Sequence, residues 1–189
     1  MIRVDLHKIG DRIAQNDHFA LKELYDLCAN SFFQLALAIV HSSEMAEEIV
    51  EDVFIQVWKN RARIPEIDNL YFYLYVSTRN ISKTYLRKYK NRKFIQFDEV
   101  QLPYFRIDLT PEDLMISGEI VNRINAAINM LPPKCRLIFK LVKEDGLKYK
   151  EVAELMGLSV KTVENQLAIA LKKIHSAVGV YLPAGTRGR

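Results

Sequence analysis

The sequence predicts an all-α protein built from two small helical domains. Glycine is nearly absent before the C-terminal half, strand-like alternation of apolar and polar residues is hard to find, and apolar residues recur at helical spacing from residue 17 to about residue 90. A chain of 189 residues with 49% hydrophobic residues can bury one large core or two small ones. We expect a helical bundle over residues 1–92, a flexible linker over 93–110, a second helical domain over 111–178 and a tail over 179–189.

The first domain is predicted to contain four helices. Ser42 or Ser43 precedes the third helix and is suited to accept hydrogen bonds from the unpaired amides of its first turn. Asp68 or Asn69 precedes the fourth, which is aromatic at its start and basic at its end. The expected helices are Phe19–Asn30 with Phe19, Leu24, Leu27 and Cys28 inward, Ser31–Val40, residues 43–61 and residues 69–91, with a loop over Arg61–Asn69 that holds Pro65.

The second domain is predicted to open with an N-capped helix. Thr110 is suited to be the N-cap, Pro111 fits the first helical position, and Glu112 and Asp113 place acids in the first turn. The expected helices are Pro111–Met130 and Pro133–Glu144, followed by a closely spaced helix pair.

Residues 149–174 have the pattern of a helix-turn-helix. Gly157 supplies the turn between the two helices, and Ser159 is placed to cap the second one. Apolar residues recur at helical spacing on one side of each helix, as Val152, Ala153, Leu155 and Met156 on the first and as Val163, Leu167, Ala170, Leu171 and Ile174 on the second.

The opposite face of the second helix is suited to the major groove of DNA. Lysines can neutralise phosphates there, while asparagine and threonine can reach base edges. An ordinary solvated helix pair is the alternative, but the turn glycine, the cap and the apolar spacing coincide, which favours DNA binding. The face carries Lys161, Asn165, Ala168 and Lys172, flanked by Thr162, Ile169 and Lys173.

Charge is unevenly distributed in the first domain, although the net charge is only +4. An acidic cluster between Glu44 and Asp52 precedes a stretch, residues 69–97, that contains basic residues and tyrosines but no acid. Such a stretch suits single-stranded nucleic acid, because aromatic rings stack on unpaired bases, but part of the aromatic set must pack in the core. The acidic cluster fits a solvated face, a magnesium or acid–base site, or a docking surface for a basic partner, and these alternatives stay open. Two such faces side by side indicate two different partners.

The sequence offers no pattern for metal, cofactor or catalytic chemistry. Cys28 and Cys135 lie far apart in apolar surroundings and are expected to be reduced and packed, and the four histidines lack ligand spacing. We therefore expect no metal, no cofactor, no small-molecule substrate and no enzymatic activity. The N-terminus lacks a signal-peptide pattern, and the longest apolar run is too short for a bilayer, so we expect a cytoplasmic protein without membrane insertion.

Three segments resemble the motifs of bacterial sigma factors. Residues 46–58, AEEIVEDVFIQVW, are similar to the helix by which sigma factors bind core RNA polymerase. Residues 70–86, followed by Arg87, resemble the helix that reads and melts the minus-ten element, and the helix-turn-helix with LSVKTVEN resembles the minus-thirty-five reader. Their order and distances are similar to those of the small extracytoplasmic-function (ECF) group of the sigma-70 family.

The resemblance implies a dissociable subunit that directs core polymerase to a promoter subset and assists DNA melting, with region 2 in the first domain and region 4 in the second. We expect the Arg61–Asn69 loop and the Tyr71–Lys88 helix to capture the unstacked minus-ten bases. The resemblance also implies as partners the beta and beta-prime subunits of core polymerase, promoter DNA and an inhibitory, membrane-linked anti-sigma factor. The matching residues are Glu48, Glu51, Asp52 and Gln56 for core polymerase, Asn69, Tyr71, Tyr73, Asn80, Lys83, Thr84, Arg87 and Lys88 for the minus-ten element, and Ser159, Lys161, Thr162, Asn165, Gln166, Lys172 and Lys173 for the minus-thirty-five element.

The chain departs from the family pattern at three of these positions and in the recognition helix, where Gln166–Ala170 is less basic than in many members. Glu51 stands where glutamine is usual and Asp52 where glutamate is, and both changes preserve an acidic docking surface. Lys83 stands where many members carry an acid.

Two other functions are compatible with parts of the sequence. A regulator of the response-regulator type can carry a very similar helix-turn-helix, but alternating strands and helices around a phospho-accepting aspartate should precede it, and the first half shows neither. A helical adaptor would bind protein through the acidic face and would not use DNA.

Overall fold

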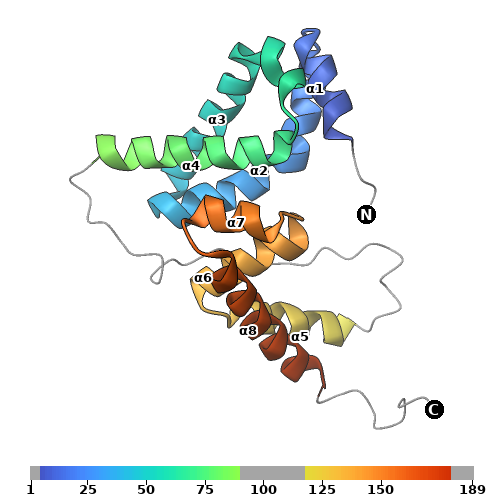
Figure 1. Cartoon of the computed structure of the whole chain (residues 1–189), viewed down its shortest axis with the longest axis vertical. Coiled ribbons are helices and arrows are strands. Elements are labelled where there is room, and N and C mark those ends of the chain that lie inside the picture. The colour runs from blue at the N-terminus through green and yellow to red at the C-terminus, as the bar shows by residue number, and fades with distance from the viewer. Residues whose placement is uncertain (1–4, 90–117, 180–189) are drawn as a thin grey trace. The chain divides into compact units, whose positions relative to one another are not determined.

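The computed structural model of the chain describes residues 5–89 and 118–179 (Figure 1). The chain divides into two compact units, one holding each of these ranges. Every regular element in the described ranges is a helix, which confirms the all-α prediction for them. The predicted linker, the helix start at Thr110 and Pro111, and residues 180–189 of the predicted tail lie outside the described residues.

Residues 5–89 form a helical bundle. The three longest helices, α2, α3 and α4, pack against one another, and α1 packs on the 3₁₀ helix η1 and on α2 (Figure 1). Asp17, Ser42 and Asn69 each cap the helix that follows, because a side-chain oxygen accepts from a first-turn amide. The elements are α1 (Leu6–Ala14), α2 (His18–Val40), α3 (Ser43–Lys59), η1 (Arg61–Glu66) and α4 (Leu70–Lys88).

One continuous helix, α2, replaces the two helices predicted over the same residues. Its buried residues Leu24, Cys28 and Phe32 follow one another at spacings of four, so a single apolar face runs past the predicted break. The inward prediction is right for Leu24 and Cys28. It is wrong for Phe19 and Leu27, which are 82% and 46% exposed.

The sequence does not predict α1 or η1. Helix α1 is short and amphipathic, it is capped by Asp5, and it buries Ile9 and Ile13 against the bundle. Helix η1 occupies most of the predicted loop, because Ile64 is buried and holds the segment against the bundle. Pro65 lies inside this turn, which loses only one backbone hydrogen-bond donor because proline has no N–H group.

Residues 118–179 pack around a second core. Lys140 is buried in a π-helical turn, and its ammonium lies 2.9 Å from Asp145 Oδ1, which fixes the chain before the helix-turn-helix. This turn replaces the end of the helix predicted over Pro133–Glu144. The elements are α5 (Gly118–Asn129), α6 (Pro133–Phe139), the π turn η4 (Lys140–Glu144), α7 (Tyr149–Met156) and α8 (Val160–Gly179), and the core contains Ile128, Leu131, Cys135, Phe139, Leu167 and Ala170.

Both cysteines are buried thiols, which confirms the prediction of reduced, packed cysteines. Cys135 Sγ lies 3.3 Å from the Gln166 carbonyl oxygen and donates to it, so it joins α6 to α8. Burial raises the pKa of the Cys135 thiol. The neutral thiol is therefore a core group of the second domain.

Candidate functional site

Helix α3 presents the acidic face that the sequence predicts. Glu48, Glu51 and Gln56 are exposed along it, while Ile49, Val53 and Val57 are buried on the opposite side. Ile55 is 48% exposed among the acids and was not a predicted site residue. A hollow of about 330 Å³ lies beside this face, lined by Tyr25, Ala29, Asn30, Phe33, Glu47, Val50 and Glu51. The face therefore combines negative charge with apolar surface.

Asp52 differs from the other acids of α3 because it is half-buried and engaged within the domain. Its Oδ2 accepts a 2.9 Å hydrogen bond from the Tyr85 hydroxyl on α4. Burial, followed by the hydrogen bond to Asp52, raises the pKa of Tyr85 to about 12. Asp52 thus links the acidic helix to α4, a role that its spacing in the sequence did not reveal.

The C-terminal half of α4 presents a basic face. Asn80, Lys83, Thr84, Arg87 and Lys88 are exposed, and Thr84 Oγ1 donates to the Asn80 carbonyl at 3.0 Å. On the inner side, Ile81 and Tyr85 pack against the cluster around Ile49. The cations that the sequence assigns to DNA are therefore brought together on one helix surface.

The structure separates the aromatic residues of α4 into two groups. Tyr75 is fully buried, and Tyr71 is half-buried with its ring centroid 6.0 Å from that of Phe32 and 5.2 Å from that of Tyr75. Tyr73 and Tyr89 are 38% and 41% exposed. Tyr71 is thus a packing residue, whereas Tyr73 is open to a ligand. Asn69, another predicted minus-ten residue, uses its Oδ1 to cap α4 at Phe72.

Beside Tyr73 the helix η1 forms a pocket of about 390 Å³, called here the η1 pocket. Arg63 and Glu66 lie at its edge 3.9 Å apart and supply a donor and an acceptor, and Ile64 supplies an apolar wall. The sequence predicted that this segment is a loop, Arg61–Asn69, that captures unstacked minus-ten bases, but it named none of the individual pocket residues except Tyr73. The lining residues are Asn60, Arg63, Ile64, Glu66, Ile67 and Tyr73.

The helix-turn-helix forms as predicted. Gly157 ends α7 with a φ of 66°, a left-handed conformation that favours glycine. Ser159 Oγ accepts from the Thr162 amide at 3.0 Å, and the two hydroxyls lie 2.8 Å apart. Val163, Leu167 and Ala170 are buried as predicted. Leu171 was predicted to be buried with them but is 42% exposed, because it lies beside this stripe rather than on it.

The predicted DNA face of α8 is open to solvent over its first turns. Lys161, Asn165 and Ala168 are exposed, and Lys161 pairs with Glu164 at 3.3 Å. Thr162 and Gln166 are half-buried, and Ser159 is engaged as the cap. Cations and polar groups therefore lie together on the N-terminal half of the helix.

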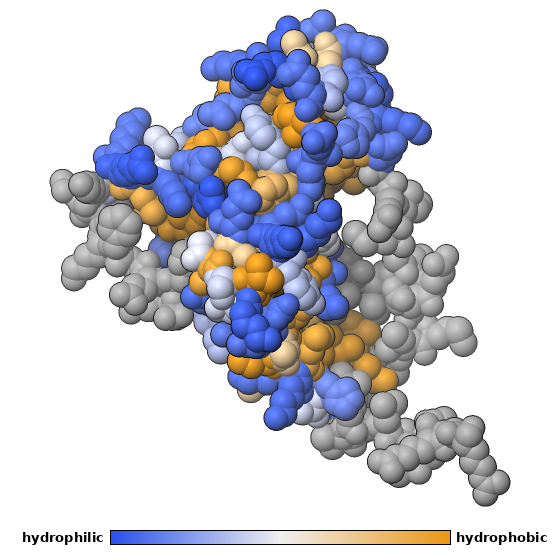
Figure 2. All heavy atoms as spheres, in the orientation of Figure 1, coloured by the Kyte–Doolittle hydropathy of each residue, from blue (hydrophilic) through white to orange (hydrophobic). Residues whose placement is uncertain are grey.

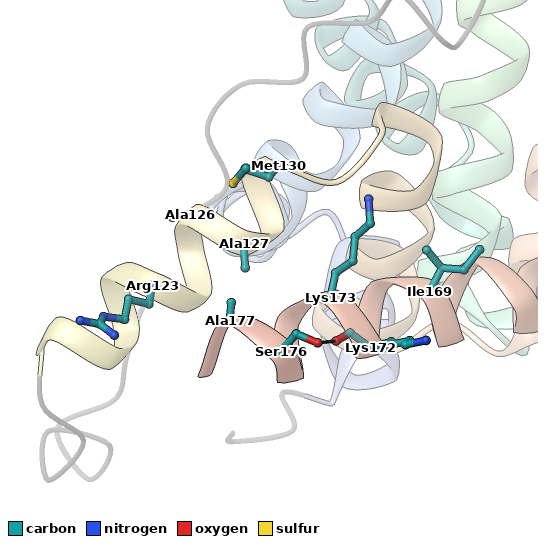
Figure 3. Close-up of a pocket in the computed structure, with 9 residues that line it drawn as sticks. All are labelled: Arg123, Ala126, Ala127, Met130, Ile169, Lys172, Lys173, Ser176 and Ala177. Carbon is teal, nitrogen blue, oxygen red and sulfur yellow. Dashed lines mark hydrogen bonds between the residues drawn. The ribbon is translucent and has the colours of Figure 1, made fainter. Parts of the chain in front are cut away.

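Lys172 and Lys173 lie further along α8, at an apolar groove that the sequence did not predict. The groove has a volume of about 830 Å³ and lies between α5 and α8. Figure 3 shows that α5 contributes Arg123, Ala126 and Ala127, that Met130 follows the end of α5, and that α8 contributes Ile169, Lys172, Lys173, Ser176 and Ala177. Met130 is 81% exposed, and Figure 2 shows hydrophobic surface over α5. We call this the α5/α8 groove.

The described residues contain neither a cluster of metal ligands nor a helix that could span a membrane. Among residues 5–89 and 118–179, no three His, Cys, Asp or Glu side chains lie together as a metal site would require. No helix in these ranges combines the length and the apolarity needed to cross a bilayer.

Two family models match the chain. The model of sigma-70 region 2 matches residues 24–92, and that of sigma-70 region 4 matches residues 122–174, together more than half of the chain. The chain belongs to the sigma-70 family of RNA polymerase sigma factors. Sigma factors are transcription initiation factors, and neither matched family is an enzyme family.

Curated relatives place this sigma factor in the ECF group. The ECF sigma factor SigK of Mycobacterium tuberculosis is 20% identical over 182 residues, covering 93% of this chain and 95% of the relative. The ECF sigma factor SigW of Bacillus subtilis is 24% identical over 163 residues, covering 82% and 87%. A solved structure of the sigma factor RpoE with the anti-sigma factor NepR, from Bartonella quintana, matches with a TM-score of 0.49 and 17% identity, covering 85% of this chain and 98% of that one. The two family models and the curated ECF relatives confirm the predicted family and group.

Proposed function

We propose that the first domain of this sigma factor docks on core RNA polymerase through the acidic face of α3. Glu48, Glu51 and Gln56 are exposed there, and Ile55 adds an apolar contact at the centre. Exposed acids contribute little to folding stability but strongly favour encounter with a basic partner. The hollow between α2 and α3 gives that partner a place to insert a side chain.

The basic face of α4 and the η1 pocket capture the separated strand of the minus-ten element. Lys83, Arg87 and Lys88 hold the backbone, while the exposed ring of Tyr73 stacks on a base. A pocket of about 390 Å³ has the size of a small-molecule site, and Arg63 and Glu66 can hydrogen-bond the edge of an unstacked base.

The second domain reads the duplex of the minus-thirty-five element through α8. The capped start of this helix carries Lys161, Thr162 and Asn165, and a helix N-terminus with such side chains suits the major groove. The α5/α8 groove is a further contact with the polymerase, holding an apolar helix of the core enzyme over Met130 and Ile169.

An anti-sigma factor is the regulatory partner that family membership leads us to expect. Such an inhibitor would act in the cytoplasm and cover Ile55 and Met130, because both are exposed apolar residues on surfaces that the polymerase needs.

The observation that carries this proposal is the opposite charge on two helices of one domain. Exposed Glu48 and Glu51 lie on α3, and exposed Lys83 and Arg87 lie on α4. A protein that binds an enzyme with one face and nucleic acid with the other needs both an acidic and a basic face. A response-regulator type protein or a helical adaptor needs only one of them, and the described residues contain no strand for a phospho-accepting domain.

A gel-shift experiment with and without core polymerase tests the proposal. We expect tight, sequence-specific binding to promoter DNA only when core polymerase is present. Specific binding by the chain alone would favour a conventional regulator, and no binding in either case would favour an adaptor.

A further inference from the structure

We propose that helix α1 sets the shape of the η1 pocket, so that Asn16 and Gly10 act as positioning residues for the base that the pocket selects. The inference rests on the proposed role of that pocket at the minus-ten element. Helix α1 ends before residue 24, where the match to sigma-70 region 2 begins, so it lies outside the matched range.

The first contact joins the turn after α1 to the start of η1. Arg61 Nε donates to Asn16 Oδ1 at 2.5 Å, and another guanidinium nitrogen of Arg61 donates to the Trp58 carbonyl at 2.9 Å. The guanidinium also lies 4.7 Å from the centre of the Trp58 ring, which stacks on the His18 ring with the two centroids 4.1 Å apart. Arg61 is therefore held inside the domain and fixes the first residue of η1.

The second contact joins α1 directly to a wall of the pocket. A Cβ on Gly10 would lie 3.0 Å from Ile64 Cγ2 and 3.6 Å from Leu70 Cδ2, so α1 approaches η1 as closely as a glycine allows. Ile64 lines the η1 pocket and is 2% exposed. A displacement of α1 at Gly10 is thus transmitted to the pocket through one side chain.

Helix η1 depends on these contacts because it has little stability of its own. It is a single 3₁₀ segment of six residues with no side-chain cap. Such turns have poorer hydrogen-bond geometry than an α-helix and adopt the position that their neighbours impose. Since Asn60, Arg63 and Glu66 come from η1 or its edge, the position of η1 determines where their polar groups point in the pocket.

Asn16→Gly is the variant that tests the first contact without unfolding the domain. Asn16 has a φ of 66°, a conformation that glycine adopts readily, so the backbone is retained while the acceptor for Arg61 is lost. The matched control is Asn16→Asp, which keeps an oxygen acceptor. Each variant is combined with core polymerase and used to select minus-ten sequences from a randomised promoter library, and thermal unfolding is recorded in parallel.

We expect Asn16→Gly to fold, to bind core polymerase normally and to lose about three- to tenfold of the preference at one minus-ten position, the scale of one typical intramolecular hydrogen bond. Asn16→Asp should keep the parent's preference at that minus-ten position, because it retains an oxygen acceptor for Arg61. Gly10→Ala, which presses on Ile64, should change the preference at the same position, whereas Asp11→Ala on the exposed side of α1 should not.

The pocket variants Tyr73→Ala and Glu66→Gln separate this inference from the proposed function. If they change the preference while Asn16→Gly and Gly10→Ala leave it unchanged, the role of α1 is refuted and the pocket assignment stands. If the pocket variants themselves leave the preference unchanged, both the pocket assignment and the role of α1 are refuted.

Discussion

The Tyr85 hydroxyl donates a 2.9 Å hydrogen bond to Asp52 and thereby joins the basic helix α4 to the acidic helix α3. The last fully buried residue of α4 is Ser82, so this bond lies where the helix begins to leave the core. Asp52 is consequently both a member of the acidic motif and a structural acceptor. Substitutions in that motif will not all have the same effect.

We predict that Asp52→Lys destabilises the first domain, whereas Glu48→Lys and Glu51→Lys do not. Removing the acceptor leaves the Tyr85 hydroxyl without its partner in a half-buried place, which costs about 1 to 3 kcal/mol. The two glutamates are exposed and solvated. Urea unfolding of the three variants checks this, and equal stability of all three would show that the hydrogen bond contributes nothing.

The double variant Glu48→Lys/Glu51→Lys should lose most of its affinity for core polymerase while remaining folded. Reversing two exposed charges turns attraction to a basic surface into repulsion, which slows association most strongly at low salt. Co-purification with core polymerase at moderate salt is the measurement. Asp11→Lys, which reverses one exposed acid on α1, is the control for a charge reversal on another surface, and retained binding by the double variant would remove the docking role of α3.

Alkaline pH should weaken the first domain through Tyr85. Its pKa is about 12 in the folded protein against an ordinary value of 10.0, so the protonated hydroxyl is favoured by folding. This contribution to stability is complete below pH 10 and is lost as the pH rises towards 12. Comparing unfolding free energies of the parent and Tyr85→Phe across that range tests it. The difference between them should shrink as the pH rises, and a constant difference would contradict the assignment.

The sequence predicted the helices whose apolar spacing is long and regular, and it missed the short elements α1 and η1, which are held by tertiary contacts. The caps Ser42, Asn69 and Ser159 could be read because each precedes a clear apolar period. Helix η1 could not be predicted in this way, because its position depends on contacts of Arg61 and Ile64 with α1 and the turn after it, which are distant in the sequence.

The candidate site shows the same division between local and tertiary information. Spacing was sufficient to place Glu48, Glu51, Lys83 and Arg87 on exposed faces. The partner of Asp52, by contrast, is 33 residues away, and the α5/α8 groove is formed by two helices that no local pattern connects.

Alanine at Lys83 or Arg87 should impair promoter opening more than the first contact with duplex DNA. Both cations are exposed on α4, and contacts to a separated strand are made only after melting. We expect a cost of about 1 to 3 kcal/mol for each base whose stacking is lost with them. Permanganate footprinting reports the opening, with Lys22→Ala on α2 as a cationic control. Normal opening combined with failure to bind closed duplex would reverse the assignment.

Asn165→Ala should change which minus-thirty-five sequences are preferred. The side chain is exposed on the early part of α8, and a lost bidentate contact to a base costs about 1 to 3 kcal/mol of discrimination. Selection from a library randomised at this element measures the preference. His175→Ala, on the exposed end of the same helix, is the control. An unchanged preferred sequence in a folded Asn165→Ala protein would mean that another surface reads the element.

The most direct test of the central claim is to map the transcripts that purified core polymerase starts in vitro with and without this protein. If the chain is a sigma factor with the surfaces described above, its addition produces discrete start sites that share one minus-ten and one minus-thirty-five sequence, and the Glu48→Lys/Glu51→Lys variant abolishes them. If core polymerase with the protein initiates no more specifically than core polymerase alone, the account is wrong.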